Sequence, residues 1–347
     1  NAIRINCPAC IDANNKLTKA ADTLTRLDVS KQQIKSLKGL KFPNLRYFNC
    51  STNELVKLPT CNFEKLEHFN CAANKIKKLP NYNFKNLTHF NCAGNELVKL
   101  PNYNFEKLEH FDCAANKIKK LPNYNFKNLT HFDCAANELI ELPAYDFKNL
   151  ILFICSDNQL KTIPNYNFEK LEDFSCINNQ LNTITNYNFK NLRWFNCSDN
   201  QLVKLPNYNF EKLEWFICSY NQIDELPNYN FEKLEWFICF YNQIDELPNY
   251  NFQNLQRFDC SNNKITELLN YNFKNLYWFD CSNNKITELL NYNFEKLEKF
   301  SCSNNQLKQL PNLPKTLEIL NIKNNPLTCI PNFPNTKIDI QLPVCKD

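Results

Sequence analysis

Residues 66–86 read LEHFNCAANKIKKLPNYNFKN, and closely similar copies of this unit follow one another along most of the chain. Each copy keeps the pattern L-x-x-F-x-C-x-x-N-x-[IL]-x-x-L-P-x-Y-x-F-x-x. Copies begin at Leu24 and Leu45, then every 21 residues up to Leu297, and the last full copy begins at Leu317 after a step of 20. A period of this length predicts a solenoid, in which each repeat is one turn stacked on the next.

The two halves of the unit predict different backbones. Phe69 and Cys71 are two residues apart, which is the spacing of side chains on one face of a β-strand. Stacked repeats would therefore form a parallel sheet with strands about 4.8 Å apart. The second half, Leu-Pro-Asn-Tyr-Asn-Phe, is too short and too rich in Pro and Asn for a helix, so we expect extended or turn-like backbone there. Side chains expected to fill the interior are Leu66, Ile76, Leu79 and Phe84.

This unit resembles the leucine-rich-repeat consensus L-x-x-L-x-L-x-x-N/C-x-L, with Phe at the second Leu position and Cys at the third, over roughly residues 24–342. The resemblance implies an α/β-type repeat solenoid that is mostly β: a right-handed superhelix with a concave parallel sheet and an extended convex side. It also implies that Asn74 and its equivalents tie adjacent turns together through backbone groups. The short, helix-free unit is most similar to bacterial internalins and Yersinia-type effectors.

Both ends of the chain depart from the period, so we divide it into an N-terminal cap (1–23), a solenoid of about 15 repeats (24–336) and a C-terminal half-repeat with a cap (337–347). A short helix is expected near residues 13–22. In the half-repeat we expect Ile340 and Leu342 to align with Leu320 and Ile322.

Five of the eighteen cysteines lie outside the repeat register: Cys7, Cys10, Cys61, Cys329 and Cys345. Caps closed by cysteines resemble those of secreted leucine-rich-repeat proteins, and Cys329–Cys345 is the bridge we expect, since it would close a short loop and stiffen the last turn. Cys7 and Cys10 have the spacing of half a zinc site, but no second Cys or His pair is near in sequence. Cys61 is expected on the convex side, where it could meet the N-terminal cap.

The remaining thirteen cysteines form a column with one member per repeat: Cys50, Cys71, Cys92, Cys113, Cys134, Cys155, Cys176, Cys197, Cys218, Cys239, Cys260, Cys281 and Cys302. A buried free cysteine packs as a small apolar side chain. Metal binding along the column is the alternative, but metal ligands must converge, whereas these side chains run parallel. We therefore expect a structural role, with no metal and no cofactor.

Charge and hydropathy exclude several classes of function. The 40 Lys and Arg nearly balance the 36 Asp and Glu, which argues against nucleic acid as a partner. The sequence contains no apolar run of about 18 residues, so it predicts no membrane span. Because the chain begins at Asn1 and contains no Met, we expect a processed N-terminus. We expect a secreted or cell-surface protein, with a cytoplasmic one as the alternative.

Functional side chains are expected where the repeat leaves the sequence free, on the outward face of the strands. In the second half of the chain these positions hold aromatic, apolar and acidic residues: Trp194, Trp215, Trp236, Trp278, Tyr220, Tyr241, Tyr277, Ile217, Ile238, Asp259 and Asp280. Tryptophan and tyrosine are enriched in interface hot spots, and an exposed apolar run on a sheet usually marks an interaction site. We predict this zone to be the main binding surface. The alternative is that the tryptophans only pack against one another.

A second zone of the same face lies earlier in the chain and is polar: His68, His89, His110, His131, Asp112 and Asp133. Stacked imidazoles could hold a divalent metal or respond to pH. Because these repeats are near-identical copies, duplication alone could also have produced the column.

The sequence holds no arrangement of nucleophile, base and acid, so we predict no catalytic residues and no enzyme activity. The function we expect is a scaffold that binds a protein ligand. The alternatives are an assembly protein that associates with itself, as a coat or filament does, and a glycan-binding module.

Overall fold

The computed structural model describes residues 19–39 and 41–345 and groups the chain into two compact units. Unit 1 (Asn1–Leu171) contains the 3-10 helix η2 (Lys19–Thr23) and the strands β1 (Arg26–Asp28), β2 (Tyr47–Asn49), β3 (His68–Asn70), β4 (His89–Asn91), β5 (His110–Asp112), β6 (His131–Asp133) and β7 (Leu152–Ile154). Unit 2 (Glu172–Asp347) contains β8 (Asp173–Ser175), β9 (Trp194–Asn196), β10 (Trp215–Ile217), β11 (Trp236–Ile238), β12 (Arg257–Asp259), β13 (Trp278–Asp280), β14 (Lys299–Ser301), β15 (Ile319–Asn321) and β16 (Lys337–Ile338).

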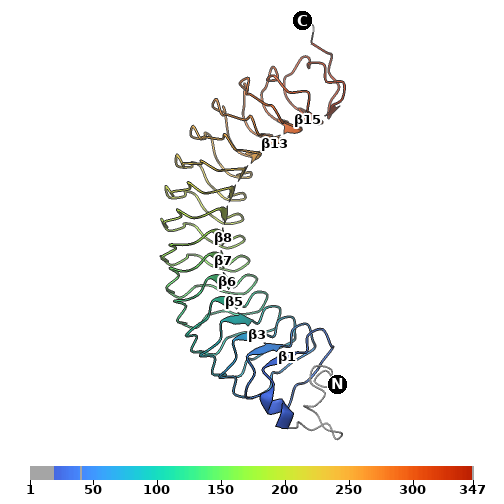
Figure 1. Cartoon of the computed structure of the whole chain (residues 1–347). Helices are drawn as coiled ribbons and strands as arrows, with labels where there is room; N and C mark the ends of the chain where they lie inside the picture. Colours follow the sequence, from blue (N-terminus) through green and yellow to red (C-terminus); the bar gives the residue numbers. More distant parts are fainter. Residues whose placement is uncertain (1–18, 40, 346–347) are drawn as a thin grey trace. The chain divides into compact units, whose positions relative to one another are not determined.

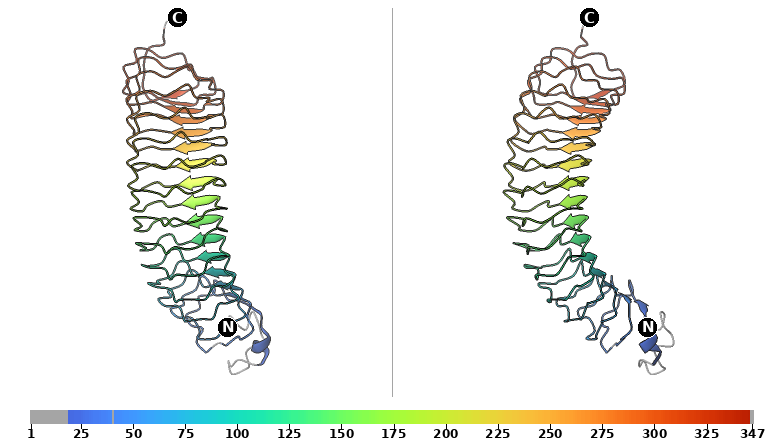
Figure 2. Two further views of the ribbon diagram at one scale, coloured as in Figure 1. Left: turned by 90° about the vertical axis from the view of Figure 1, so that its left-hand side faces the viewer. Right: turned by 60° about the vertical axis from the view of Figure 1, so that its left-hand side comes forward.

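Within each unit, every strand pairs in parallel with the strand of the next repeat (Figure 1). Residues at the same repeat position face each other, as His68 and His89 do on β3 and β4, and Trp215 and Trp236 on β10 and β11. Figure 2 shows that within each unit the strands follow one another on one side of the coil, with irregular loops on the other side. The chain is thus a parallel β-solenoid with almost no helix, as the 21-residue period predicts.

Aromatic rings stacked from turn to turn fill the interior. Phe69 lies 5.4 Å from Phe48 and 5.6 Å from Phe90, centroid to centroid, with nearly parallel planes. The tyrosine at the Tyr82 position, present in eleven repeats, belongs to the same core, although we did not expect it there. Tyr82 is 5% exposed, and its hydroxyl donates to the carbonyl of Pro59 in the preceding repeat (2.6 Å). A buried ring of this size contributes about 1.5–3 kcal/mol, so every turn adds a similar increment of stability.

The predicted asparagine ladder is confirmed. The Asn74 Nδ2 group donates to the carbonyls of Cys50 (3.0 Å) and Cys71 (3.1 Å), and its Oδ1 accepts from the backbone N–H of Leu55 (2.9 Å). One buried amide therefore satisfies backbone groups of its own turn and of the preceding one, which short strands leave unpaired.

The cysteine column is structural. Its thirteen thiols are free and buried, and burial raises the pKa of thiols such as Cys92 and Cys260 well above the usual range. A protonated thiol is a weak nucleophile and a poor metal ligand. Cys61 is also free, and burial raises its pKa to about 11. Cys7 and Cys10 lie outside the described residues.

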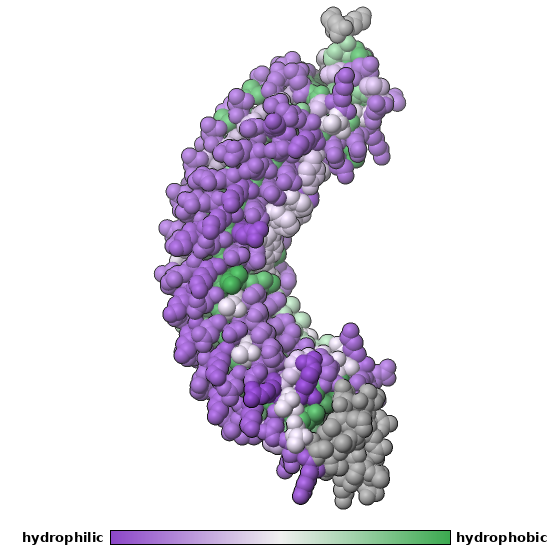
Figure 3. Space-filling view, viewed as in Figure 1, coloured by the Kyte–Doolittle hydropathy of each residue, from purple (hydrophilic) through white to green (hydrophobic). Residues whose placement is uncertain are grey.

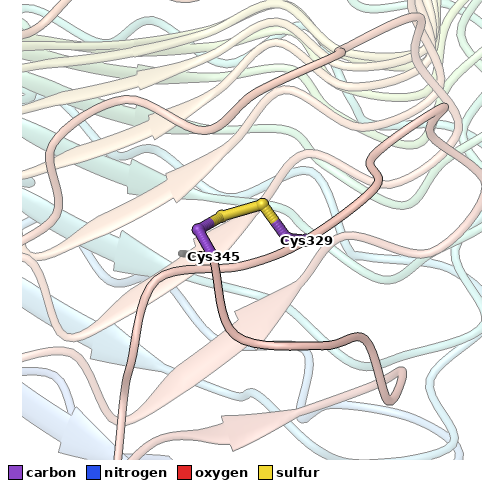
Figure 4. The surroundings of a disulfide bond; sticks show 2 residues. All are labelled: Cys329 and Cys345. Carbon is purple, nitrogen blue, oxygen red and sulfur yellow. A yellow bond between two sulfur atoms is a disulfide. The ribbon is translucent and has the colours of Figure 1, made fainter. Parts of the chain in front are cut away.

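The C-terminal disulfide has the predicted partners, Cys329 and Cys345, whose Cα atoms are 4.9 Å apart (Figure 4). The predicted alignment of the half-repeat is wrong by two residues, because β16 places Ile338, and not Ile340, opposite Leu320. Leu320 and Ile338 are only 18 residues apart (338 − 320), so the last connection is shorter than in the other repeats and the chain reaches the sheet earlier. For the same reason Leu342 does not continue this ladder.

The N-terminal end is described only from residue 19. Helix η2 (Lys19–Thr23) overlaps the end of the helix expected near 13–22, and residues 13–18 lie outside the described part. The cap boundaries after residues 23 and 336 remain a prediction. No helix in the described ranges is long and apolar enough to cross a membrane.

Candidate functional site

Each three-residue strand turns its middle phenylalanine inward and its first and last side chains outward, because successive side chains alternate across a strand. On β10, for example, Phe216 is fully buried, whereas Trp215 is 39% exposed. Parallel pairing in register then places equivalent outward side chains next to one another. The outward face of each unit consequently carries continuous columns of side chains.

The four predicted tryptophans lie in one column of unit 2, which we call the aromatic column: Trp194, Trp215, Trp236 and Trp278, with Arg257 between the last two. The rings of Trp215 and Trp236 stack at 4.9 Å with an interplanar angle of 16°. The Arg257 guanidinium lies 5.1 Å from the Trp236 ring centroid and 4.2 Å from that of Trp278. Our site prediction omitted Arg257, although its register in the column was visible in the sequence.

A second aromatic pair, Tyr220 and Tyr241, follows the strands β10 and β11 and is called the tyrosine pair. The two rings stack at 4.9 Å and are 48% and 50% exposed. Phe240 packs against Tyr220 edge-on at 5.1 Å. Exposed rings held in parallel are suited to receive flat or apolar groups of a ligand.

Both members of the tyrosine pair have left-handed backbone, with φ of 51°. This corner of the repeat is left-handed in nearly every turn, and elsewhere it holds Gly94 or small and polar residues such as Asn262 and Asn283. Asn and Gly tolerate positive φ, whereas residues with bulky side chains are strained in this conformation. The fold therefore does not favour tyrosine at these two corners.

The other predicted residues of this zone are less accessible. Ile238 and Asp259 are only 6% and 8% exposed, and Ile217 and Asp280 are half-buried. Asp259 accepts from the Ser261 N–H (3.0 Å) and hydroxyl (2.7 Å). Burial, and next the neighbouring Asp280, raise the pKa of Asp259 to about 6. These side chains support the face more than they offer it to a ligand.

Tyr277 lies apart from the aromatic column, at the start of the strand that carries Trp278. It lines a shallow polar groove of about 590 Å³ together with Glu235, Gln256 and Lys296.

In unit 1 the four predicted histidines stack from strand to strand as the histidine column, His68, His89, His110 and His131, with centroids 4.2, 4.3 and 4.2 Å apart. With the outward Asn and Asp side chains they line a groove of about 370 Å³. Burial, and then the neighbouring imidazoles, lower the pKa of His89, and burial and His131 lower that of His110. Burial raises the pKa of Asp133 to about 6.

A threonine hydroxyl contacts His89. The Thr88 hydroxyl lies 2.9 Å from the carbonyl of Glu67 and 3.0 Å from His89 Nδ1. Thr130 and His131 repeat this arrangement. In the described part of the chain, no three His, Cys, Asp or Glu side chains are placed to hold a metal ion, and stacked rings direct their lone pairs in parallel.

Comparisons with known proteins agree with this architecture. The family model described as Leucine Rich Repeat matches residues 254–276. Among solved structures, the chain is similar to YopM from Yersinia enterocolitica (TM-score 0.72, 23% identity, 92% of this chain and 78% of that one). It is also similar to a leucine-rich-repeat protein of Leptospira interrogans (TM-score 0.68, 25% identity, covering 93% and 97%).

A third similar structure is the functional domain of InlJ from Listeria monocytogenes, described as including a cysteine ladder (TM-score 0.66, 25% identity, covering 87% and 73%). None of the curated protein sequences matches significantly. The chain is a leucine-rich-repeat protein, a class of scaffolds that is generally non-enzymatic and typically binds proteins. Its 21-residue repeats resemble those of the bacterial YopM and internalin proteins.

Proposed function

We propose that this protein is a non-enzymatic scaffold that binds a protein ligand on the outward sheet face of unit 2. The observation that supports it best is a pair of aromatic stacks in the same two repeats: the exposed Trp215 on the half-buried Trp236, and the exposed Tyr220 on the exposed Tyr241. Rings of this kind are the usual anchors of interfaces. The left-handed backbone of both tyrosines supports the proposal further, since strain that the fold does not require is often kept for function.

The similar structures support a protein-binding function, because they belong to a class of proteins that typically binds other proteins. One related Yersinia pestis structure is described as a leucine-rich effector protein. We propose by analogy that this chain acts outside the cell that makes it, as a secreted or cell-surface factor; a cytoplasmic role is the alternative. The terminal disulfide Cys329–Cys345 supports an oxidising location.

The test is quantitative affinity capture with mass spectrometry, comparing wild type with Trp215→Ala/Trp236→Ala. We expect the partner to be recovered by wild type and lost by the variant, because truncation removes both stacked anchors. The matched control is His89→Ala/His110→Ala, which makes the same change in the stacked column of unit 1 and should still recover the partner. Equal recovery by all three proteins would refute the aromatic site.

Two alternative functions, self-assembly and glycan binding, can be tested by simple measurements. If the chain is an assembly protein, light scattering should report a mass that rises with concentration, and Trp215→Ala/Trp236→Ala should abolish the rise. If the ligand is a glycan, enzymatic deglycosylation of the captured partner should release it. A monomer that retains a deglycosylated partner supports protein recognition.

A further inference from the structure

The two repeats that carry both aromatic stacks are strongly acidic. Residues 213–254 contain seven Asp and Glu and one Lys. The two repeats 66–107, which carry His68 and His89 at the same outward positions, contain three Glu and six Lys. The whole chain is slightly basic at +4. Negative charge is therefore concentrated where the exposed aromatic rings are, and it is not a general property of the repeat.

Several of these carboxylates have no cationic partner. Glu214 is paired with Arg193, and Glu225 with Lys204. In the described part of the chain, the other five form no ion pair within 4 Å: Asp224, Glu232, Glu235, Asp245 and Glu246. Figure 3 shows that the loop side of the solenoid is predominantly hydrophilic.

Asp224 and Asp245 occupy equivalent positions in the two repeats, whereas the equivalents of Glu235 and Glu246 are the paired Glu214 and Glu225. Glu235 directly precedes Trp236, and its N–H donates to the carbonyl of Glu214, which directly precedes Trp215. Asp224 and Asp245 each follow a member of the tyrosine pair by four residues, a span of at most about 14 Å. Acidic residues therefore precede and follow the rings in the sequence, and the side chain of Glu235 lines the neighbouring groove that holds Tyr277.

The aromatic column already binds a cation of its own. Arg257 occupies the position next to Trp236 and places its guanidinium over that ring and over Trp278. Its buried Nε has no hydrogen-bond partner in the described structure, so contact with the rings holds it. In unit 1, Arg26 lies over Tyr47 in the same way, 3.5 Å from the ring centroid. Each of these arginines thus contacts a ring and also lowers the pKa of a nearby carboxyl, Asp259 for Arg257 and Asp28 for Arg26.

Resting on the function proposed above, we propose that the partner presents a basic, extended polypeptide segment whose arginine or lysine side chains stack on Trp215 and the tyrosine pair. The unpaired carboxylates around the rings supply the complementary charge. A guanidinium combines a flat face for stacking with N–H groups for carboxylates, so arginine should bind better than lysine. An acidic or uncharged partner would leave these carboxylates uncompensated.

Intrinsic fluorescence tests this directly, because all four tryptophans of the chain lie in the aromatic column. The full chain is titrated with three synthetic peptides of equal length, alternating Arg-Ser, Lys-Ser and Glu-Ser. We expect Arg-Ser to change the fluorescence saturably, Lys-Ser to bind more weakly and Glu-Ser not to bind. Added salt should weaken binding, because the flanking charges are exposed.

Two variants separate the roles of rings and charge. Glu235→Gln/Asp245→Asn keeps the shape and removes two carboxylates, and it should weaken Arg-Ser binding about tenfold and flatten its salt dependence. Tyr220→Asn/Tyr241→Asn should weaken binding by a similar factor while thermal stability stays equal or rises, since asparagine suits the left-handed corner. Lys78→Gln/Lys99→Gln, in unit 1, is the control and should bind as wild type.

The proposal is overturned if Glu-Ser or a neutral Gln-Ser peptide binds as tightly as Arg-Ser, or if Glu235→Gln/Asp245→Asn binds with unchanged affinity. Either result leaves the aromatic scaffold intact as long as Trp215→Ala/Trp236→Ala still loses its captured partner. If that variant keeps its partner, the proposed function itself fails, whatever the peptides do.

Discussion

At the scale of single residues, stability and function depend on different positions of the repeat. The ladder asparagine is fixed by the backbone groups it satisfies: the Asn221 amide donates to the carbonyls of Cys197 and Cys218 and accepts from the Leu202 N–H. Its loss would leave buried backbone groups unpaired, at a cost of about 1–3 kcal/mol for each. The outward positions carry no such obligation, so there the sequence is free to vary.

Asp259 illustrates an outward residue that burial makes unfavourable. Because its folded pKa is about 6, above the ordinary 3.8, its ionised form destabilises the fold above pH 6, and this cost disappears as the pH falls toward 3.8. Asp259→Asn should therefore raise stability by about 1–3 kcal/mol at pH 7 and have little effect at pH 4. The amide can donate to Asp280, as Asn91 does to Asp112 (3.0 Å).

Thermal unfolding at pH 4 and pH 7 checks this. The exposed Asp146→Asn is the control, because its carboxylate does not leave water. An Asp259→Asn variant whose advantage is the same at both pH values would contradict the explanation through titration.

At the scale of the strand, each element is too short to be stable alone and gains its stability from its neighbours. A three-residue strand such as β4 buries one phenylalanine between two others, 5.6 and 5.5 Å away. Stacking in register also brings like side chains together on the outward face. In the histidine column, burial and then a neighbouring imidazole lower the pKa of His89 and of His110.

The histidine column makes a pH prediction for unit 1. The pKa of His89 and His110 is lowered in the folded state, so the fold should lose stability as the pH falls below their unfolded value of about 6.5. Asp133, with a pKa of about 6, acts in the opposite direction, and Glu109 favours protonation of both imidazoles. His89→Gln/His110→Gln should be indistinguishable from wild type at pH 8 and more stable at pH 5.

Circular dichroism melts at the two pH values measure the difference, with Lys78→Gln/Lys99→Gln as a control that removes positive charge without titrating in this range. A histidine double variant that is no more stable than wild type at pH 5 would show that the stacked imidazoles are energetically neutral. The same pair of pH values applied to ligand capture would detect a role of the histidine column in binding.

At the scale of the whole molecule, the solenoid has no closed core, so its open ends need separate protection. Contacts are made with adjacent repeats, and the stability of a repeat depends on its nearest neighbours. At the C-terminal end the disulfide joins Cys329 and Cys345, 16 positions apart, and closes a loop that contains β16. Ile330 and Val344 form an isolated parallel bridge within that loop.

Removing this bridge should therefore have a local effect. In Cys329→Ser/Cys345→Ser we expect the last repeats to lose about 3 kcal/mol, the loop entropy that the cross-link removes from the unfolded chain. Hydrogen exchange should report faster exchange in β15 and β16, with β3 to β6 unchanged as an internal control. Loss of protection throughout the chain would mean that the solenoid unfolds as one cooperative body.

The sequence by itself determined the fold, because a periodic chain has one simple way to bury its repeating residues. The strand positions and the cysteine, tryptophan and histidine columns followed from spacing, whereas the disulfide and the ladder role of the asparagines followed from the resemblance to leucine-rich repeats. The half-repeat was misaligned because it departs from the period, and Tyr82 was missed as a core residue because its hydroxyl pairs with a carbonyl of the preceding turn.

Only the tertiary structure decided which outward residues are available to a ligand. Ile238 and Asp259 share the face with Trp215 but are almost fully buried, and the left-handed corners that expose Tyr220 and Tyr241 do not appear in the periodic pattern. The seating of Arg257 between two tryptophans likewise depends on side-chain packing across three strands. Spacing along the chain fixes which residues are neighbours, whereas exposure and strain depend on how those neighbours pack.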